Sequence, residues 1–279
     1  MTRTTALQHL IDRIGVLVER ETVYAGTINT AYLAAGSGQP VVLLHGAMAA
    51  GITWYPVIGP LAAHFRVIAP DIVGYGQSDK PSGRYDRPYY CAWLAAFLDA
   101  LGVEKAHVVG HSQGGAIALQ FALDHPARVD RLVLVDSAGL SYAVPLGIIF
   151  AMLCYNLFPS RATGLWLSRY AMRNPQNIDP ALGDYMIQVT ELRGSRRSLL
   201  RARTHTRIRA GQLGQITQQT LIIWGRDDRF LPMAQGAAAA EAMPHAELHV
   251  IPEAGHVPFF DQSQAFNDVL IRFLKGEGR

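Results

Sequence analysis

Short apolar runs alternate along this chain with segments in which apolar residues recur every three or four positions. Runs of four or five mostly apolar residues predict buried strands, and they lie at 41–44, 66–69, 106–109, 131–135, 220–224 and 247–251. Helical periodicity occurs between several of them, at 90–101, 116–123, 234–242 and 262–273. This alternation predicts the α/β class, with a mostly parallel sheet covered by helices on both faces.

The amino-terminal part adds a helix and a hairpin to this pattern. Residues 5–18 place six apolar side chains on one helical stripe, namely Leu7, Leu10, Ile11, Ile14, Leu17 and Val18. We therefore expect residues 1–22 to hold an amphipathic helix that docks on the core or on a second subunit of a homodimer. A membrane-surface anchor is disfavoured because the polar face is not rich in lysine or arginine. Alternation over 23–33 predicts two hairpin strands.

The alternation of predicted strands with predicted helices stops at about residue 140 and resumes near residue 211. Between these points the sequence has only helical patterns, separated by prolines. We expect one sheet domain, formed by 23–139 and 211–279, that is interrupted by a helical cap over 140–210.

Composition excludes several classes of protein. With 49% hydrophobic and 17% charged residues, the 279-residue chain can bury a large core. The formal net charge is +3 and no basic patch is interleaved with aromatic residues, so we expect no nucleic-acid partner. We expect no membrane insertion, because the longest apolar run is short and is broken by proline, glycine and asparagine. Cys91 and Cys154 lie in apolar helical patterns, and no secretory signal is visible, which suggests a cytoplasmic protein.

The sharpest chemical signal is a serine between glycines. Residues 110–115 read Gly-His-Ser-Gln-Gly-Gly, after a predicted strand and before a predicted helix. This is the context of a nucleophile elbow, in which flanking glycines leave room for a serine on strained backbone. The start of the following helix favours negative charge that develops at the hydroxyl. Ser112 is therefore the candidate nucleophile.

Acids and a histidine follow other predicted strands. Asp136 comes after the strand at 131–135, Asp227 and Asp228 follow the next one, and His256 follows the last. The carboxyl ends of parallel strands meet at one edge of a sheet, so these side chains are expected near Ser112. A serine hydroxyl needs a base to take its proton, and the base needs an acid that orients it. His256 is the candidate base.

Five motifs, from about residue 23 to the carboxyl terminus, resemble the α/β-hydrolase fold superfamily. They are His45-Gly46 with Trp54 downstream, the loop at 71–78, the serine elbow, Gly225-x-x-Asp228 with Pro232, and Gly255-His256. The order serine, acid, histidine is also that of the superfamily. The resemblance implies an α/β-hydrolase fold with a helical cap inserted after the sixth strand, and an enzyme that uses no cofactor and no metal.

The resemblance also assigns roles within the candidate site. It makes Asp228 the acid of a Ser-His-Asp triad, with Asp136 and Asp227 as less favoured alternatives. It places the oxyanion hole at the backbone N–H groups of Ala47 and Gln113.

We expect the cap to select the substrate. Its first part is strongly apolar, and the pocket is expected to be lined by Met48, Ile149, Phe150, Leu153 and Phe259, together with Phe260. The sequence thus predicts a serine hydrolase whose substrate is a hydrophobic small molecule, a carboxylic ester or related acyl compound with an apolar acyl or aromatic part.

Two alternatives remain open. A carbon–carbon bond hydrolase of the meta-cleavage product type shares the triad and the cap. Known sequences of that type tend to have asparagine before the nucleophile and tryptophan after the histidine, where this chain has His111 and Val257. Its anionic substrate would need an arginine partner from the group Arg193, Arg196, Arg197 and Arg201. The second alternative is a ligand receptor built on a hydrolase scaffold.

Overall fold

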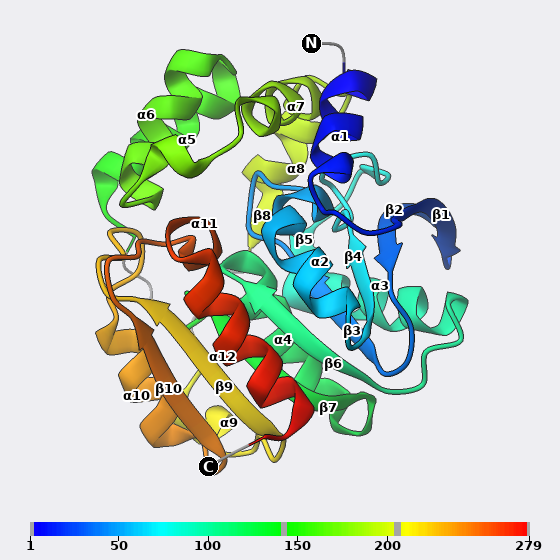
Figure 1. Cartoon of the computed structure of the whole chain (residues 1–279), viewed down its shortest axis with the longest axis vertical. Helices are drawn as coiled ribbons and strands as arrows, with labels where there is room; N and C mark the ends of the chain where they lie inside the picture. The colour runs from blue at the N-terminus through cyan, green and yellow to red at the C-terminus, as the bar shows by residue number, and fades with distance from the viewer. Residues whose placement is uncertain (1–2, 141–143, 204–207, 278–279) are drawn as a thin grey trace.

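A computed structural model describes residues 3–140, 144–203 and 208–277. Within them, an eight-stranded sheet has the order β1-β2-β4-β3-β6-β7-β9-β10 (Figure 1). The strands are β1 (Glu19–Ala25), β2 (Ile28–Ala35), β3 (Pro40–Leu44), β4 (Arg66–Pro70), β6 (Ala106–His111), β7 (Val129–Val135), β9 (Gln219–Gly225) and β10 (Ala246–Ile251). From β4 to β10 all neighbours are parallel, whereas β1 and β2 form an antiparallel hairpin and β2 is antiparallel to β4. The predicted fold class is confirmed.

Helices cover both faces of the sheet because its central strands are apolar on both sides. In β3, Leu43 packs into one hydrophobic cluster and Leu44 into the other, and both are fully buried. The first cluster includes side chains of α1 (Arg3–Asp12), α2 (Tyr55–Ala62) and α12 (Ser263–Lys275). The second includes side chains of α3 (Arg87–Ala100), α4 (Gln113–Asp124), α9 (Ala210–Leu213) and α10 (Ala234–Ala242).

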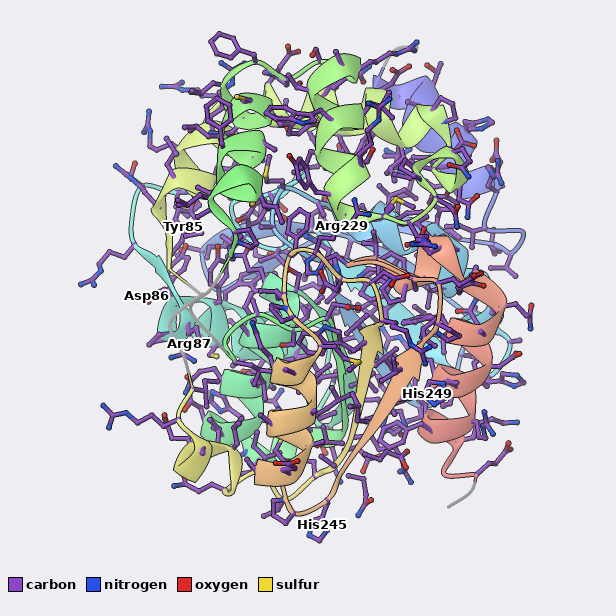
Figure 2. The ribbon with its side chains drawn as sticks, turned by 90° about the vertical axis from the view of Figure 1, so that its left-hand side faces the viewer. Tyr85, Asp86, Arg87, Arg229, His245 and His249 are labelled. Atoms are coloured by element: carbon purple, nitrogen blue, oxygen red, sulfur yellow. The ribbon has the colours of Figure 1, made fainter. Side chains whose placement is uncertain are left out.

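Of the described helices between β7, the sixth strand of the sheet, and β9, four lie away from the sheet, whereas α9 packs against the core. The four are α5 (Leu146–Leu157), α6 (Arg161–Ala171), α7 (Pro180–Thr190) and α8 (Ser195–Arg201), and they form a separate layer at one end of the molecule (Figure 1). Parts of the predicted cap, residues 141–143 and 204–207, lie outside the described residues. A short parallel pair, β5 (Tyr85–Asp86) with β8 (Ala202–Arg203), joins the end of this layer to the core, and Tyr85 and Asp86 are labelled in Figure 2.

The remaining short elements lie in connections between the longer helices and strands. They are the 3₁₀ turns η1 (Gly51–Trp54), η2 (Pro126–Arg128) and η3 (Pro175–Asn177), and the helix α11 (Pro258–Asp261). No helix in the described part of the chain is long and apolar enough to cross a bilayer.

The amino-terminal helix is shorter than its apolar pattern suggests. It ends at Asp12, and Gly15 with φ of +77° then turns the chain, so Leu17 is 84% exposed. The stripe is therefore buried only as far as Ile14. The helix packs against α7 of the cap layer, where Arg13 Nη1 lies 2.8 Å from Asp179 Oδ2.

Candidate active site

Ser112 lies on strained backbone between β6 and α4. Its φ of +51° is unusual for a residue with a side chain, and such strain persists only where the surrounding structure enforces it. The flanking glycines allow this turn, because a Cβ at Gly110 would lie 2.4 Å from the carbonyl oxygen of Gly114. A Cβ at Gly114 would lie 2.2 Å from the carbonyl oxygen of Leu44. The predicted elbow is therefore formed by tight packing of β6, α4 and the end of β3.

A chain of hydrogen bonds links the three predicted catalytic side chains. His256 Nε2 lies 3.0 Å from Ser112 Oγ, and His256 Nδ1 lies 2.8 Å from Asp228 Oδ2. His256 and Asp228 have side chains that are 6% and 0% exposed, so the second contact is shielded from water. Asp228 Oδ1 accepts the backbone N–H groups of Phe230 and Leu231, at 2.7 and 3.0 Å. These bonds stabilise the ionised carboxylate and fix its direction.

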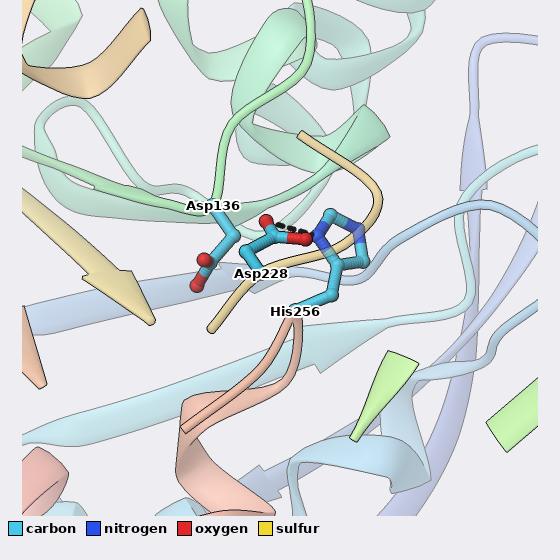
Figure 3. Close-up of side chains that lie close together, drawn as sticks. All are labelled: Asp136, Asp228 and His256. Atoms are coloured by element: carbon cyan, nitrogen blue, oxygen red, sulfur yellow. Dashed lines mark hydrogen bonds and ion pairs between the residues drawn. The ribbon is translucent and has the colours of Figure 1, made fainter. Parts of the chain in front are cut away.

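The two other candidate acids occupy different positions. Asp136 is fully buried, and its Oδ1 accepts the backbone N–H of Gly225 at 2.9 Å. Ligand atoms of Asp136, Asp228 and His256 all lie within 4.8 Å of one another, yet the imidazole hydrogen bond goes to Asp228 (Figure 3). Burial, followed by the charge of Asp228, raises the pKa of Asp136 well above its ordinary value. Asp227 lies apart from the imidazole, with Oδ2 3.6 Å from Arg173.

Two aromatic neighbours hold His256 in place. The ring of Phe230 stacks on the imidazole, with centroids 4.6 Å apart and planes 5° from parallel. His111 Nε2 lies 2.7 Å from the backbone oxygen of His256, and a carbonyl only accepts, so that nitrogen carries the proton. Burial, and then the neighbouring His256, lowers the pKa of His111 well below its ordinary value. His111 is thus a neutral residue that anchors the loop of His256.

His45 orients the peptide that precedes Ala47. Its Nε2 accepts the N–H of Ile72 at 2.9 Å, so its Nδ1 is the donor to the Gly46 carbonyl oxygen, at 2.7 Å. Burial lowers the pKa of His45 to about 4, which keeps the ring neutral. The N–H of Ala47 points to the opposite side of that trans peptide from the Gly46 carbonyl. Within the described chain, neither this N–H nor that of Gln113 donates to another group, and both residues line the cavity above Ser112.

A cavity of 990 Å³ lies between the cap layer and the core and includes Ser112 and His256. Its wall is mostly apolar and comes from the core loops and from α5, α6 and α7. The predicted residues Met48, Ile149, Leu153 and Phe260 line it. Sequence reasoning missed the contribution of α7, which adds Leu182, Met186 and Ile187. It also missed Phe230, although this residue follows Asp228 in the same turn.

Two pocket predictions are wrong. Phe259 is 1% exposed and is absent from the cavity wall, because it stacks on Trp54 in the core at 4.5 Å between centroids. Phe150 lies on the opposite side of α5 from the core and is 59% exposed. The arginines considered as carboxylate partners also lie elsewhere: Arg193, Arg196, Arg197 and Arg201 are exposed and do not line the cavity.

The chain is similar to known hydrolases over most of its length. Residues 39–153 and 151–263 match the family model of the alpha/beta hydrolase fold. The chain is 34% identical over 264 residues to a 2-hydroxy-6-oxo-6-phenylhexa-2,4-dienoate hydrolase of Burkholderia cepacia, covering 86% of this chain and 89% of that protein.

Solved structures show the same fold. The meta-cleavage product hydrolase CumD of Pseudomonas fluorescens IP01 is 30% identical, with a TM-score of 0.84 over 92% of this chain and 97% of the other. The carboxylesterase CesB of Bacillus subtilis reaches a TM-score of 0.89 over 99% and 98% of the two chains, at 22% identity, which shows likeness of fold alone.

Proposed function

The chain belongs to the α/β-hydrolase fold family and is a hydrolase, and we propose that it cleaves carboxylic esters with a large apolar acyl or aromatic part. The observation that carries this proposal is the character of the cavity around Ser112. Among its described lining residues, Arg161 is the single arginine or lysine. Its Nε and Nη2 each lie 2.8 Å from a carboxylate oxygen of Asp184. A substrate carboxylate would therefore have to displace Asp184, whereas an uncharged ester needs no such exchange.

Hydrolysis proceeds in two stages from this arrangement. Ser112 Oγ attacks the ester carbonyl carbon as His256 Nε2, 3.0 Å away, takes the hydroxyl proton. The backbone N–H groups of Ala47 and Gln113 stabilise the oxyanion, and Asp228 stabilises the imidazolium. His256 then gives the proton to the leaving alkoxide oxygen, which leaves an acyl group on Ser112. Water, deprotonated by His256, attacks this acyl group, and the acid product leaves with Ser112 reprotonated.

A second candidate is carbon–carbon bond hydrolysis of a meta-cleavage product. The 34% identity to a 2-hydroxy-6-oxo-6-phenylhexa-2,4-dienoate hydrolase favours it, because that identity extends over most of both chains. Such a dienoate carries a carboxylate, for which the described lining residues of this cavity offer one arginine, the paired Arg161. His111 and Val257 also replace the asparagine and tryptophan typical of that type. We therefore rank ester hydrolysis first.

One panel of substrates separates the two candidates. We propose measuring kcat/KM for p-nitrophenyl esters from acetate to decanoate beside 2-hydroxy-6-oxo-6-phenylhexa-2,4-dienoate, with Ser112→Ala as the blank. Each buried methylene contributes about 0.8 kcal/mol, so kcat/KM should rise roughly threefold to fourfold per carbon until the pocket is full. A flat profile, with faster turnover of the dienoate, would overturn the ester proposal in favour of the second candidate. Tight binding of a ligand without turnover of any compound would favour a receptor.

A further inference from the structure

Helix α5 is apolar on the side that faces away from the protein. The helix contains no charged residue, and its inner side buries Ile148, Ala151, Tyr155 and Asn156. Its other side carries apolar residues at the spacing i, i+4, i+7 and i+11, followed by one more after the helix end. This outer stripe consists of Leu146, Phe150, Leu153, Leu157 and Phe158, which are 84%, 59%, 40%, 42% and 70% exposed.

Such a surface is unusual for a soluble protein on its own. A helix that is hydrophobic all round is normally buried in a protein or in contact with lipid. Helices α5 and α6 lie at the cap end of the molecule, away from the sheet, on the opposite side of α7 from α1 (Figure 1). The outer stripe therefore has the position and the character of an interaction surface.

The charges beside the outer stripe indicate what it binds. Helix α8 packs against α5 and carries the exposed residues Arg196, Arg197 and Arg201. None of α5, α6 and α8 contains an aspartate or glutamate. An apolar face with a cationic border fits an anionic amphiphile surface. A second copy fits less well, because α5, α6 and α8 of that copy would offer no aspartate or glutamate to pair with these arginines.

We propose that the outer stripe docks on the surface of an anionic lipid bilayer, with the arginines of α8 at the head groups. The helix lies along the interface and does not cross it. The stripe is continuous with the cavity wall, because Leu153 belongs to both and Ile149 and Leu165 are half-exposed lining residues beside it. An apolar acyl chain could thus pass from the lipid surface towards Ser112 without crossing a charged region.

Vesicle sedimentation tests the proposal without any turnover. The full chain is mixed with vesicles of phosphatidylcholine and phosphatidylglycerol in equal parts, or of phosphatidylcholine alone. We expect binding to the anionic vesicles and at least a tenfold weaker partition for Phe150→Ser/Phe158→Ser. The matched control is Leu17→Ser/Tyr24→Ser, which removes two apolar side chains that are 84% and 68% exposed outside the cap. This control should bind as the parent does. Arg196→Gln/Arg197→Gln should lose most of the preference for anionic vesicles.

Three results would overturn the docking proposal. One is a parent protein that sediments no better with anionic vesicles than without them. Another is equal weakening by the control pair. The third is a dimer, measured by light scattering, that becomes a monomer in Phe150→Ser/Phe158→Ser, which would assign the stripe to a second copy. Thermal melts that match the parent show that each variant is folded. Because no substrate is used, these outcomes are independent of the ester proposal.

Discussion

The carboxyl group of Asp136 lies beside that of Asp228 at the buried end of the hydrogen-bond chain (Figure 3). The two carboxyl groups accept different numbers of hydrogen bonds. Asp228 accepts two backbone N–H groups and the imidazole, whereas Asp136 accepts one backbone N–H and its Oδ2 has no partner among the described residues. Two buried carboxyl groups this close disfavour a second negative charge, which adds to burial in raising the pKa of Asp136.

This asymmetry predicts different effects of two matched substitutions. Asp228→Asn should lower kcat by about 10⁴-fold, because an amide holds the imidazole in the wrong tautomer. Asp136→Asn should retain most of the activity, since an amide resembles the neutral carboxyl. Steady-state kinetics with one good ester substrate measures both variants. The reverse ranking would make Asp136 the acid.

Asp136 should also make stability depend on pH. Its pKa is raised in the folded protein, so the folded state holds this proton more tightly than the unfolded state does. Its contribution to stability is present below the unfolded pKa of about 3.9 and is lost as the pH rises towards the folded value. Asp136→Asn removes that loss. In urea unfolding, the variant should gain stability relative to the parent between pH 4 and pH 8. A difference that does not change with pH would show that Asp136 is ionised.

His45 should act on the transition state through the peptide that it holds. His45→Ala removes the hydrogen bond to the Gly46 carbonyl and frees the Ala47 N–H to rotate away. Because the oxyanion develops after binding, kcat should fall with little change in KM. Loss of an oxyanion donor costs about 10²–10³-fold, which is the upper limit here. A rise in KM at constant kcat would instead place His45 in substrate binding.

Phe230 should contribute to catalytic activity, because its ring stacks on the imidazole of His256. Phe230→Ala removes a contact of about 0.5–1.5 kcal/mol, so kcat/KM should fall roughly twofold to tenfold. Phe230→Tyr keeps the ring and is the matched control, with activity near that of the parent. If both variants lose activity equally, the ring stack is not the cause.

Asn156 should affect which acyl groups are preferred. It lines the cavity, is 1% exposed, and its Nδ2 has no partner among the described residues. A buried unpaired amide costs about 1–3 kcal/mol, so Asn156→Leu should raise thermal stability. The variant should also turn over wholly apolar acyl chains at least as fast as the parent, and lose rate on chains that carry an ether or ketone oxygen. Equal losses on both kinds of chain would contradict this role.

The sequence predicted the sheet because strand signals are local. Runs such as 41–44 are apolar at every position, and burial on both faces requires that pattern. The amino-terminal helix was predicted too long, since apolar periodicity continues past Gly15, where the backbone turns. The nucleophile elbow was predictable because glycine is required at two positions by sterics that act within a few residues.

The residues that line the pocket were harder to predict than the strands, because they depend on how the helices pack. Phe150 and Leu153 both belong to α5, yet Leu153 lines the cavity and Phe150 does not. Phe259 was expected in the apolar pocket, but it lies in α11 and packs into the core against Trp54. Likewise, the strand positions placed Asp136 and Asp228 at one sheet edge. The family resemblance favoured Asp228, and it is Asp228 that lies within hydrogen-bond distance of the imidazole.

Ser112 should form an acyl-enzyme from an apolar ester, and mass spectrometry of the reacting protein detects that intermediate. The full chain is mixed with p-nitrophenyl octanoate, quenched in acid within the first turnover, and digested. We expect a burst of about one p-nitrophenol per chain and one octanoyl group on the peptide that contains Ser112. An octanoyl group on another residue, or hydrolysis that continues unchanged in Ser112→Ala, would contradict it.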